Sequence, residues 1–132
     1  MRKKSLIIPL ILILFSIVAC KNENPQLSVS IKEISNCLTD SKKQITEKDS
    51  SFGYHATSTE LTINKYYGFY SCEGEINVSA EIKDNVIAIT EQSSTEKQCT
   101  CPKNLTYTIE NIPYGSYKIS INGKIIGDIL IY

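Results

Sequence analysis

The sequence predicts an all-β protein, a small antiparallel β-sandwich of Greek-key or immunoglobulin-like type that follows an N-terminal signal helix. Three observations lead to this class. Apolar and polar residues alternate with a period of two from residue 59 to the end of the 132-residue chain. Turn-forming residues recur at short intervals, and no long helical period is found after residue 40. Six or seven strands at this spacing are typical of a sandwich or a barrel.

The first twenty residues form a secretory leader. A basic segment at positions 2–4 precedes an almost unbroken apolar run over 6–18, which is the layout of a signal peptide. The run is shorter than the about 20 apolar residues of a transmembrane helix. The leader ends in the tetrapeptide Ile-Val-Ala-Cys at positions 17–20, which resembles the lipobox of bacterial lipoproteins. The resemblance implies cleavage before Cys20 and lipidation of Cys20. An uncleaved signal anchor with an incidental cysteine is the alternative.

These features divide the chain into a lipoprotein signal peptide over 1–19, a lipidated tether over 20–26 and a single β-sandwich domain over 27–132. Removing the signal leaves 113 residues, a length that suits one domain. That mature chain has eleven lysines and fourteen acidic residues, a net charge of about −3. This charge argues against a nucleic-acid partner, which needs a basic surface. The expected partner is the lipid bilayer, reached through acylated Cys20, and the expected location is the bacterial cell envelope at the outer membrane.

Four further cysteines form an even set once Cys20 is set aside. In an exported domain, Cys37, Cys72, Cys99 and Cys101 predict two disulfides. A Cys99–Cys101 bridge is disfavoured, because side chains two residues apart on a strand lie about 6–7 Å apart. Two pairings stay open: Cys37–Cys99 with Cys72–Cys101, and Cys37–Cys101 with Cys72–Cys99. We expect each bridge to add about 2–4 kcal/mol to stability.

A four-thiolate zinc site is the alternative use of these cysteines. Structural zinc sites usually contain paired ligands with two to four residues between them, whereas the close pair of this chain, Cys99 and Cys101, has one. A redox-active pair is disfavoured as well, because the C-x-C segment lacks the helix N-terminus that activates C-x-x-C motifs. The sequence therefore predicts no metal and no cofactor.

The first third of the domain is weakly patterned. Alternation of Leu27, Val29 and Ile31 fits a strand, whereas a helical spacing over 31–38 fits a short helix, and the sequence leaves both open. Residues 39–58 are polar and charged, which predicts a long loop or an irregular edge of the sheet. The single histidine, His55, is expected to be a solvated residue of that loop.

Period-two alternation identifies the later strands, at 61–64, 76–82, 86–90, 105–109, 117–121 and 125–132. Asp84-Asn85 is expected to reverse the chain, and Asn122-Gly123 is the strongest signal for a type I′ hairpin turn. A polar loop is expected over 91–98, and Gly127 marks a bulge. Tyr117 follows a Pro-Tyr-Gly turn and fits either a tyrosine corner or an ordinary core aromatic.

Two segments of the domain share a pattern with other proteins. One runs over 61–76 and places an apolar strand and an aromatic turn before Cys72. The other runs over 99–117 and joins the C-x-C segment to an Asn-Ile-Pro-Tyr-Gly-Ser-Tyr turn. Together they resemble a family of small lipoproteins from the Bacteroidota, over about half of the chain at 59–122. The resemblance implies a disulfide-bearing β domain and no particular activity, because the family has no assigned reaction.

The sequence favours a binding or structural module without enzymatic activity. Tyr66, Tyr67 and Tyr70 cluster before Cys72, and aromatic side chains bring a large area and a polar tip to an interface. We expect them to contact an envelope protein or a glycan, although alternation directs some of this cluster to the core.

The alternative function is a small envelope hydrolase or a metal-binding protein that uses the cysteines or the Glu73/Glu75 pair. Two carboxylates on one face of a strand can hold a cation or act as an acid and a base. Charged strand ends are more often solvated edges that discourage aggregation. A Ser/His arrangement is disfavoured, because the chain has one histidine and no G-x-S-x-G motif.

Overall fold

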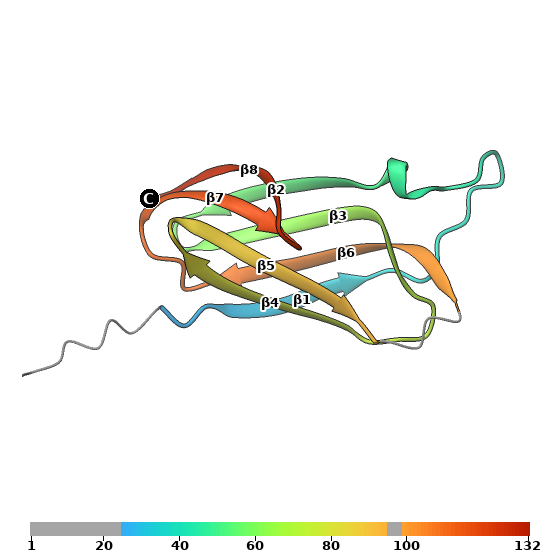
Figure 1. Ribbon diagram of the computed structural model, residues 1–132, viewed down its shortest axis with the longest axis horizontal. Helices are drawn as coiled ribbons and strands as arrows, with labels where there is room; N and C mark the ends of the chain where they lie inside the picture. Colours follow the sequence, from blue (N-terminus) through green and yellow to red (C-terminus); the bar gives the residue numbers. More distant parts are fainter. Residues whose placement is uncertain (1–24, 95–98) are drawn as a thin grey trace, which may run out of the picture.

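The structure is a computed structural model, and it describes residues 25–94 and 99–132 (Figure 1). The predicted signal peptide and the lipidation site at Cys20 lie outside the described residues. Within them, no helix is long and apolar enough to cross a membrane. The described chain forms eight strands and one 3-10 turn: β1 (Ser28–Ile34), η1 (Glu47–Asp49), β2 (Ser51–Thr57), β3 (Glu60–Ser71), β4 (Ile76–Lys83), β5 (Val86–Ser93), β6 (Thr100–Glu110), β7 (Gly115–Ile121) and β8 (Lys124–Ile131).

The strands form two four-stranded sheets that face each other (Figure 1). One sheet has the order β1-β6-β3-β2 and the other has the order β4-β5-β7-β8. The predicted all-β sandwich is thereby confirmed. The first sheet is antiparallel throughout, and the second contains one parallel pair, β5 with β7. That pair is parallel because the chain crosses to the other sheet for β6 before it returns as β7.

The core lies between the two sheets and follows the period-two pattern of the sequence. Side chains that point inward from the strands are buried, and their neighbours along the chain face outward. The central strands β3, β5, β6 and β7 supply most of the core, which contains Leu61, Ile63, Tyr70, Ile76, Ile87, Ile89, Leu105, Tyr107, Ile109, Ile112, Tyr117, Ile119, Ile121 and Ile131.

Both predicted hairpin turns are confirmed. The backbone φ angles are 51° and 58° at Asp84 and Asn85, and 48° and 81° at Asn122 and Gly123. Two successive positive φ angles define the type I′ turn, whose twist matches that of the flanking strands. Tyr117 is a tyrosine corner, because its hydroxyl donates to the carbonyl oxygen of Pro113, four residues upstream, at 2.9 Å.

Three expectations for the less patterned segments are settled or corrected. The ambiguous segment near residue 30 is a strand, β1. Of the two structures predicted for 39–58, a loop is wrong for the second half and an edge is right, because β2 pairs along β3 at the edge of its sheet. Exposed His55 lies on this strand and not in a loop. The polar loop predicted over 91–98 begins later, because β5 continues to Ser93. These strands are hard to see in sequence because β2 is a half-exposed edge strand and the end of β5 carries polar residues.

A tyrosine on β2 closes one side of the sandwich. The Tyr54 hydroxyl donates to the carbonyl oxygen of Asp128 on β8, at 3.5 Å. A Cβ atom at Gly127 would clash with the hydroxyl and ring of Tyr54, so the glycine admits this side chain. The predicted bulge is confirmed beside Gly127, because the register of β8 shifts between the partners of Ile119 and Ser120.

Candidate functional site

A bulge in β3 separates the three candidate tyrosines. Between Lys65 and Gly68, two residues of β3 stand opposite one residue of β6, Asn104. Tyr66 and Tyr67, at the bulge, are 44% and 40% exposed. The extra residue reverses the alternation beyond it, so the side chain of Tyr70 turns inward. Its place in the predicted contact surface is therefore wrong, since Tyr70 is 4% exposed and belongs to the core.

The bulge holds Tyr67 in a rare backbone conformation. Its φ is 54°, in the left-handed region that costs an L-residue roughly 1–2 kcal/mol. The Tyr67 amide donates to the side-chain oxygen of Asn104 at 3.1 Å, and this bond stabilises the conformation. Strained residues of this kind concentrate at functional sites. Tyr66 and Tyr67 are therefore displayed by a rigid backbone, and we call them the tyrosine pair.

A shallow hollow lies near the tyrosine pair. It has a volume of about 240 Å³ and is lined by Leu38, Thr39, Asp40, Lys43, Gln44, Ile45 and Pro102. The amide of Leu38 donates to the carbonyl oxygen of Pro102 at 2.8 Å, which attaches this loop to β6. Pro102 lines the hollow and lies two residues along β6 from Asn104, which binds the Tyr67 amide, so the hollow and the tyrosine pair are neighbours. The pKa of Lys43 is raised, chiefly by its hydrogen bond to Asp49.

The loop around the hollow is held by a local polar network. Lys43 Nζ lies 2.5 Å from an Asp49 oxygen. The other Asp49 oxygen accepts hydrogen bonds from the amide and the hydroxyl of Thr46, at 2.9 and 3.0 Å. The hydrogen bonds from Lys43 and Thr46 lower the pKa of Asp49 to about 2. The apolar and polar groups of the hollow are thus presented on an ordered loop.

A buried charged cluster lies between the sheets and was missed by sequence analysis. One Glu91 oxygen accepts from Lys65 Nζ at 2.6 Å and from the Tyr70 hydroxyl at 2.8 Å, and the other accepts from the Tyr107 hydroxyl at 2.8 Å. Lys65 Nζ also lies 5.3 and 4.9 Å from the ring centres of Phe52 and Tyr70. Glu91 continues the inward series of β5, which is the signal that could have revealed it.

This charged cluster is a structural element of the core. Burial, followed by the charge of Glu91 and the hydrogen bonds to it, raises the pKa of Tyr70 and that of Tyr107. Both tyrosines therefore stay protonated and donate to the carboxylate. Since the carboxylate and the Lys65 ammonium partner each other across the two sheets, the cluster fixes how the sheets align.

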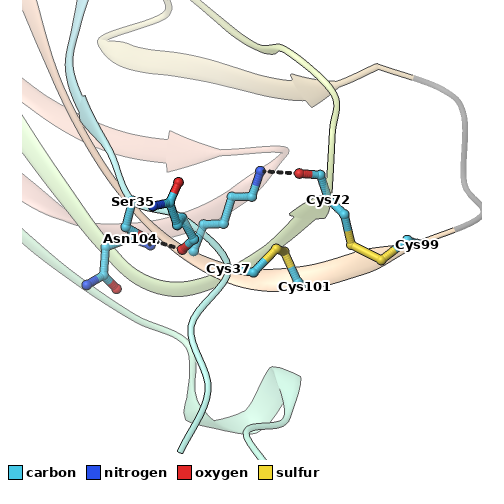
Figure 2. Close-up of a disulfide and its surroundings, with 8 residues drawn as sticks. Ser35, Cys37, Cys72, Cys99, Cys101 and Asn104 are labelled. Carbon is cyan, nitrogen blue, oxygen red and sulfur yellow. Dashed lines mark hydrogen bonds between the residues drawn. A yellow bond between two sulfur atoms is a disulfide. The ribbon is translucent and has the colours of Figure 1, made fainter.

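The four cysteines form two neighbouring disulfides at one end of the sandwich (Figure 2). The bridges are Cys37–Cys101 and Cys72–Cys99, one of the two pairings that the sequence left open. The sulfur atoms of Cys37, Cys72 and Cys101 all lie within 4.8 Å of one another. Each of these sulfur atoms belongs to a disulfide. Because a metal ion binds a thiolate, the oxidised sulfur atoms do not form a metal site. Cys101 is buried, Cys72 is half-buried, and Cys37 and Cys99 are exposed.

A buried lysine lies beside this pair of bridges and was also missed by sequence analysis. Lys103 is 7% exposed, and its ammonium donates to the carbonyl oxygen of Cys72 at 3.1 Å. In Figure 2 this bond is the dashed line at the labelled Cys72. Among residues 25–94 and 99–132, no carboxylate oxygen lies within 4.0 Å of this ammonium. Lys103 lies on the same inward face of β6 as the core residues Leu105 and Tyr107, and that position was its sequence signal.

The predicted carboxylate pair lies elsewhere than expected. Glu73 and Glu75 are exposed residues of the connection between β3 and β4, outside the strands on which we placed them. Among the described residues, the one group of three potential metal ligands is that of the cysteines. Within the described part of the chain, no third His, Cys, Asp or Glu side chain therefore joins Glu73 and Glu75 in a candidate metal site.

Comparisons of the chain with protein-family models, with curated proteins and with solved structures find no significant match. The resemblance to small Bacteroidota lipoproteins stays a prediction from the sequence.

Proposed function

We propose that this protein is a binding module of the bacterial cell envelope that uses the tyrosine pair as its contact surface. The observation that carries the proposal is the exposure of Tyr66 and Tyr67 on a backbone that Asn104 holds in a left-handed conformation. Rigid aromatic side chains lose little conformational entropy on binding. Tyrosine is among the residue types that dominate binding energy at interfaces.

The hollow beside the tyrosine pair supports a partner with both apolar and polar groups. Leu38, Ile45 and Pro102 supply apolar surface, while Asp40 and Lys43 supply charge. Aromatic rings next to such a mixed surface suit a glycan or a protein segment of the envelope. The module itself carries out no reaction in this proposal.

The binding proposal is tested with the mature domain, residues 20–132, immobilised on beads and presented with solubilised envelope of the host bacterium. We expect Tyr66→Ser/Tyr67→Ser to lower saturable capture of a defined protein or glycan at least fivefold. Tyr114→Ser is the matched control, because Tyr114 is exposed on the β6–β7 connection. Equal capture by the double variant and the control would show that the tyrosine pair is not the contact surface. Unchanged thermal unfolding confirms that the variants fold.

We further propose that the module is held at the membrane by lipid on Cys20, in keeping with the leader described above. Two or more acyl chains give stable anchoring, whereas one chain of myristoyl length is marginal. Cys20→Ser should abolish incorporation of a labelled fatty acid and release the protein from the membrane fraction. Continued labelling of Cys20→Ser would contradict the anchor without bearing on the tyrosine pair.

A further inference from the structure

We propose that the two disulfides form a thiol-exchange site, in which an external dithiol opens Cys72–Cys99 and the Cys72 thiolate then attacks the Cys37–Cys101 bridge. This inference is independent of the proposed binding function. It rests on three features of the cysteine cluster: the exposure of its sulfur-bearing residues, the buried ammonium of Lys103 and the closeness of the two bridges.

Exposure and the leaving group together select the bridge that opens first. Each bridge has one exposed residue, Cys99 in one and Cys37 in the other, and an attacking thiolate has to approach a disulfide sulfur directly. Attack at Cys37 would release the thiolate of buried Cys101, which burial disfavours, whereas attack at Cys99 releases half-buried Cys72. The favoured target is therefore the Cys99 sulfur, and Cys72 becomes the leaving group.

Lys103 makes Cys72 a good leaving group. Its ammonium is bound to the carbonyl oxygen of Cys72 and has no carboxylate partner among the described residues. A positive charge near a thiol favours the thiolate, and a more acidic thiol leaves faster from a disulfide. Glu73 and Glu75, the nearest acidic residues in sequence, oppose this effect, but both are exposed and their charges are screened by water.

The first step is a two-electron reduction of the Cys72–Cys99 bridge. One thiolate of the external dithiol bonds to the Cys99 sulfur, and the electron pair of the broken S–S bond goes to Cys72. The second thiol of the dithiol then bonds to its own partner sulfur and releases Cys99. The external dithiol leaves as a disulfide, and the domain gains two electrons and two protons.

The second step moves the remaining bridge without further redox change. The Cys72 sulfur lies within 4.8 Å of both Cys37 and Cys101 sulfurs, so a small side-chain movement brings it into bonding contact. Attack on Cys101 releases Cys37, whose exposed thiolate is solvated by water, whereas attack on Cys37 would release a buried thiolate. The product is a Cys72–Cys101 bridge with Cys37 and Cys99 as free thiols.

The first step is tested on the mature domain with one equivalent of dithiothreitol and a metal chelator, without oxygen. Free thiols are trapped with N-ethylmaleimide and mapped by mass spectrometry. We expect the singly bridged population to carry the label on Cys99 in every species. Opening of Cys37–Cys101 while Cys72–Cys99 stays intact would overturn the proposal.

The second step is tested without reductant in Cys99→Ser, which leaves Cys72 as a free thiol beside the other bridge. We expect this variant to contain both Cys37–Cys101 and Cys72–Cys101 bridges, with the label divided between Cys72 and Cys37. Recovery of Cys37–Cys101 alone would show that the neighbouring bridge is not attacked and would overturn the exchange.

The role of Lys103 is tested in the same Cys99→Ser background. Lys103→Met keeps the length of the side chain and removes its charge. We expect it to shift the pH profile of Cys72 alkylation to higher pH in this background. In the protein that keeps all four cysteines, Lys103→Met should slow dithiothreitol opening of the Cys72–Cys99 bridge about threefold or more. Lys118→Met, on the exposed face of β7, is the control. An identical alkylation profile in Lys103→Met and Lys118→Met would remove Lys103 from the mechanism.

Discussion

At the scale of single residues, the most consequential group is the carboxylate of Glu91. Its side chain is 1% exposed, and that of its partner Lys65 is 13% exposed. Removing one partner of such a pair leaves an uncompensated buried charge, whereas replacing both by apolar groups can be nearly neutral. Alternation alone assigns Lys65 and Glu91 to inward positions of β3 and β5. Sequence cannot show that these two positions face each other, because that depends on how the sheets align.

We predict that Glu91→Leu destabilises the domain by about 3–5 kcal/mol, because it leaves the Lys65 ammonium buried without its carboxylate partner. The double variant Glu91→Leu/Lys65→Met should recover only part of this loss, because the Tyr70 and Tyr107 hydroxyls still lose their acceptor. Urea unfolding of the single, double and wild-type proteins measures both effects. Glu81→Leu, at an exposed position of β4, is the control. A Glu91→Leu loss no larger than that of the control would contradict the buried pair.

Tyr70 and Tyr107 give a prediction for alkaline pH. Burial and the charge of Glu91 raise the pKa of both side chains above the ordinary value of 10.0. Above that pH the unfolded chain loses protons that the folded chain keeps, so the stabilisation from these groups is complete below about pH 10 and falls as the pH rises. Urea midpoints from about pH 9 to about 11 should fall less steeply in Tyr107→Phe than in wild type. Equal slopes would show that Tyr107 is not protected from ionisation.

At the scale of strands, a bulge changes which side chains of an alternating strand point into the core. The bulge opposite Asn104 turns Tyr70 into the core and displays Tyr66 and Tyr67. Gly68 follows it, and a Cβ atom there would lie 2.6 Å from the Tyr70 ring and 2.8 Å from the Lys65 side chain. A strand read with an uninterrupted period of two therefore assigns Tyr67 and Tyr70 to the wrong faces. Gly68 is the local signal for the bulge, because an isolated glycine within a strand often marks one.

The contact between β2 and β8 gives a prediction at this scale. Gly127→Ala should destabilise the domain by about 1–3 kcal/mol, because the new methyl group forces Tyr54 from its place. In a Tyr54→Ala background the same change should cost far less. Thermal unfolding of the four proteins in this double-mutant cycle measures the coupling. Additive effects would mean that Tyr54 and Gly127 do not touch.

At the scale of the whole molecule, the two disulfides join distant parts of the chain to the start of β6. Cys37–Cys101 spans 64 residues and Cys72–Cys99 spans 27. The loop before β2 and the connection between β3 and β4 are thus held at one end of the sandwich. Sequence reduced the pairings to two, and the register of β3 on β6 selected one, because Ser71 lies opposite Thr100 and Cys72 therefore lies opposite Cys99.

We predict that removing the longer bridge costs more. In the chain-entropy description, Cys37→Ser/Cys101→Ser should lose about 0.8 kcal/mol more stability than Cys72→Ser/Cys99→Ser. Urea unfolding of both double variants provides the comparison. A larger loss from the shorter bridge would indicate that native-state contacts, and not loop closure, control the contribution of each disulfide.

The sequence by itself determined the class of fold, the later strands and the places of the two hairpin turns, because alternation and turn chemistry are local properties of the chain. It also predicted two disulfides among the four cysteines that follow Cys20, and the structure has two. Only the tertiary structure decided the disulfide pairing, the strand β2, the inward turn of Tyr70 and the partners of Glu91 and Lys103. Each of these depends on which residues of distant strands face one another, and that is set by the packing of two sheets around a common core.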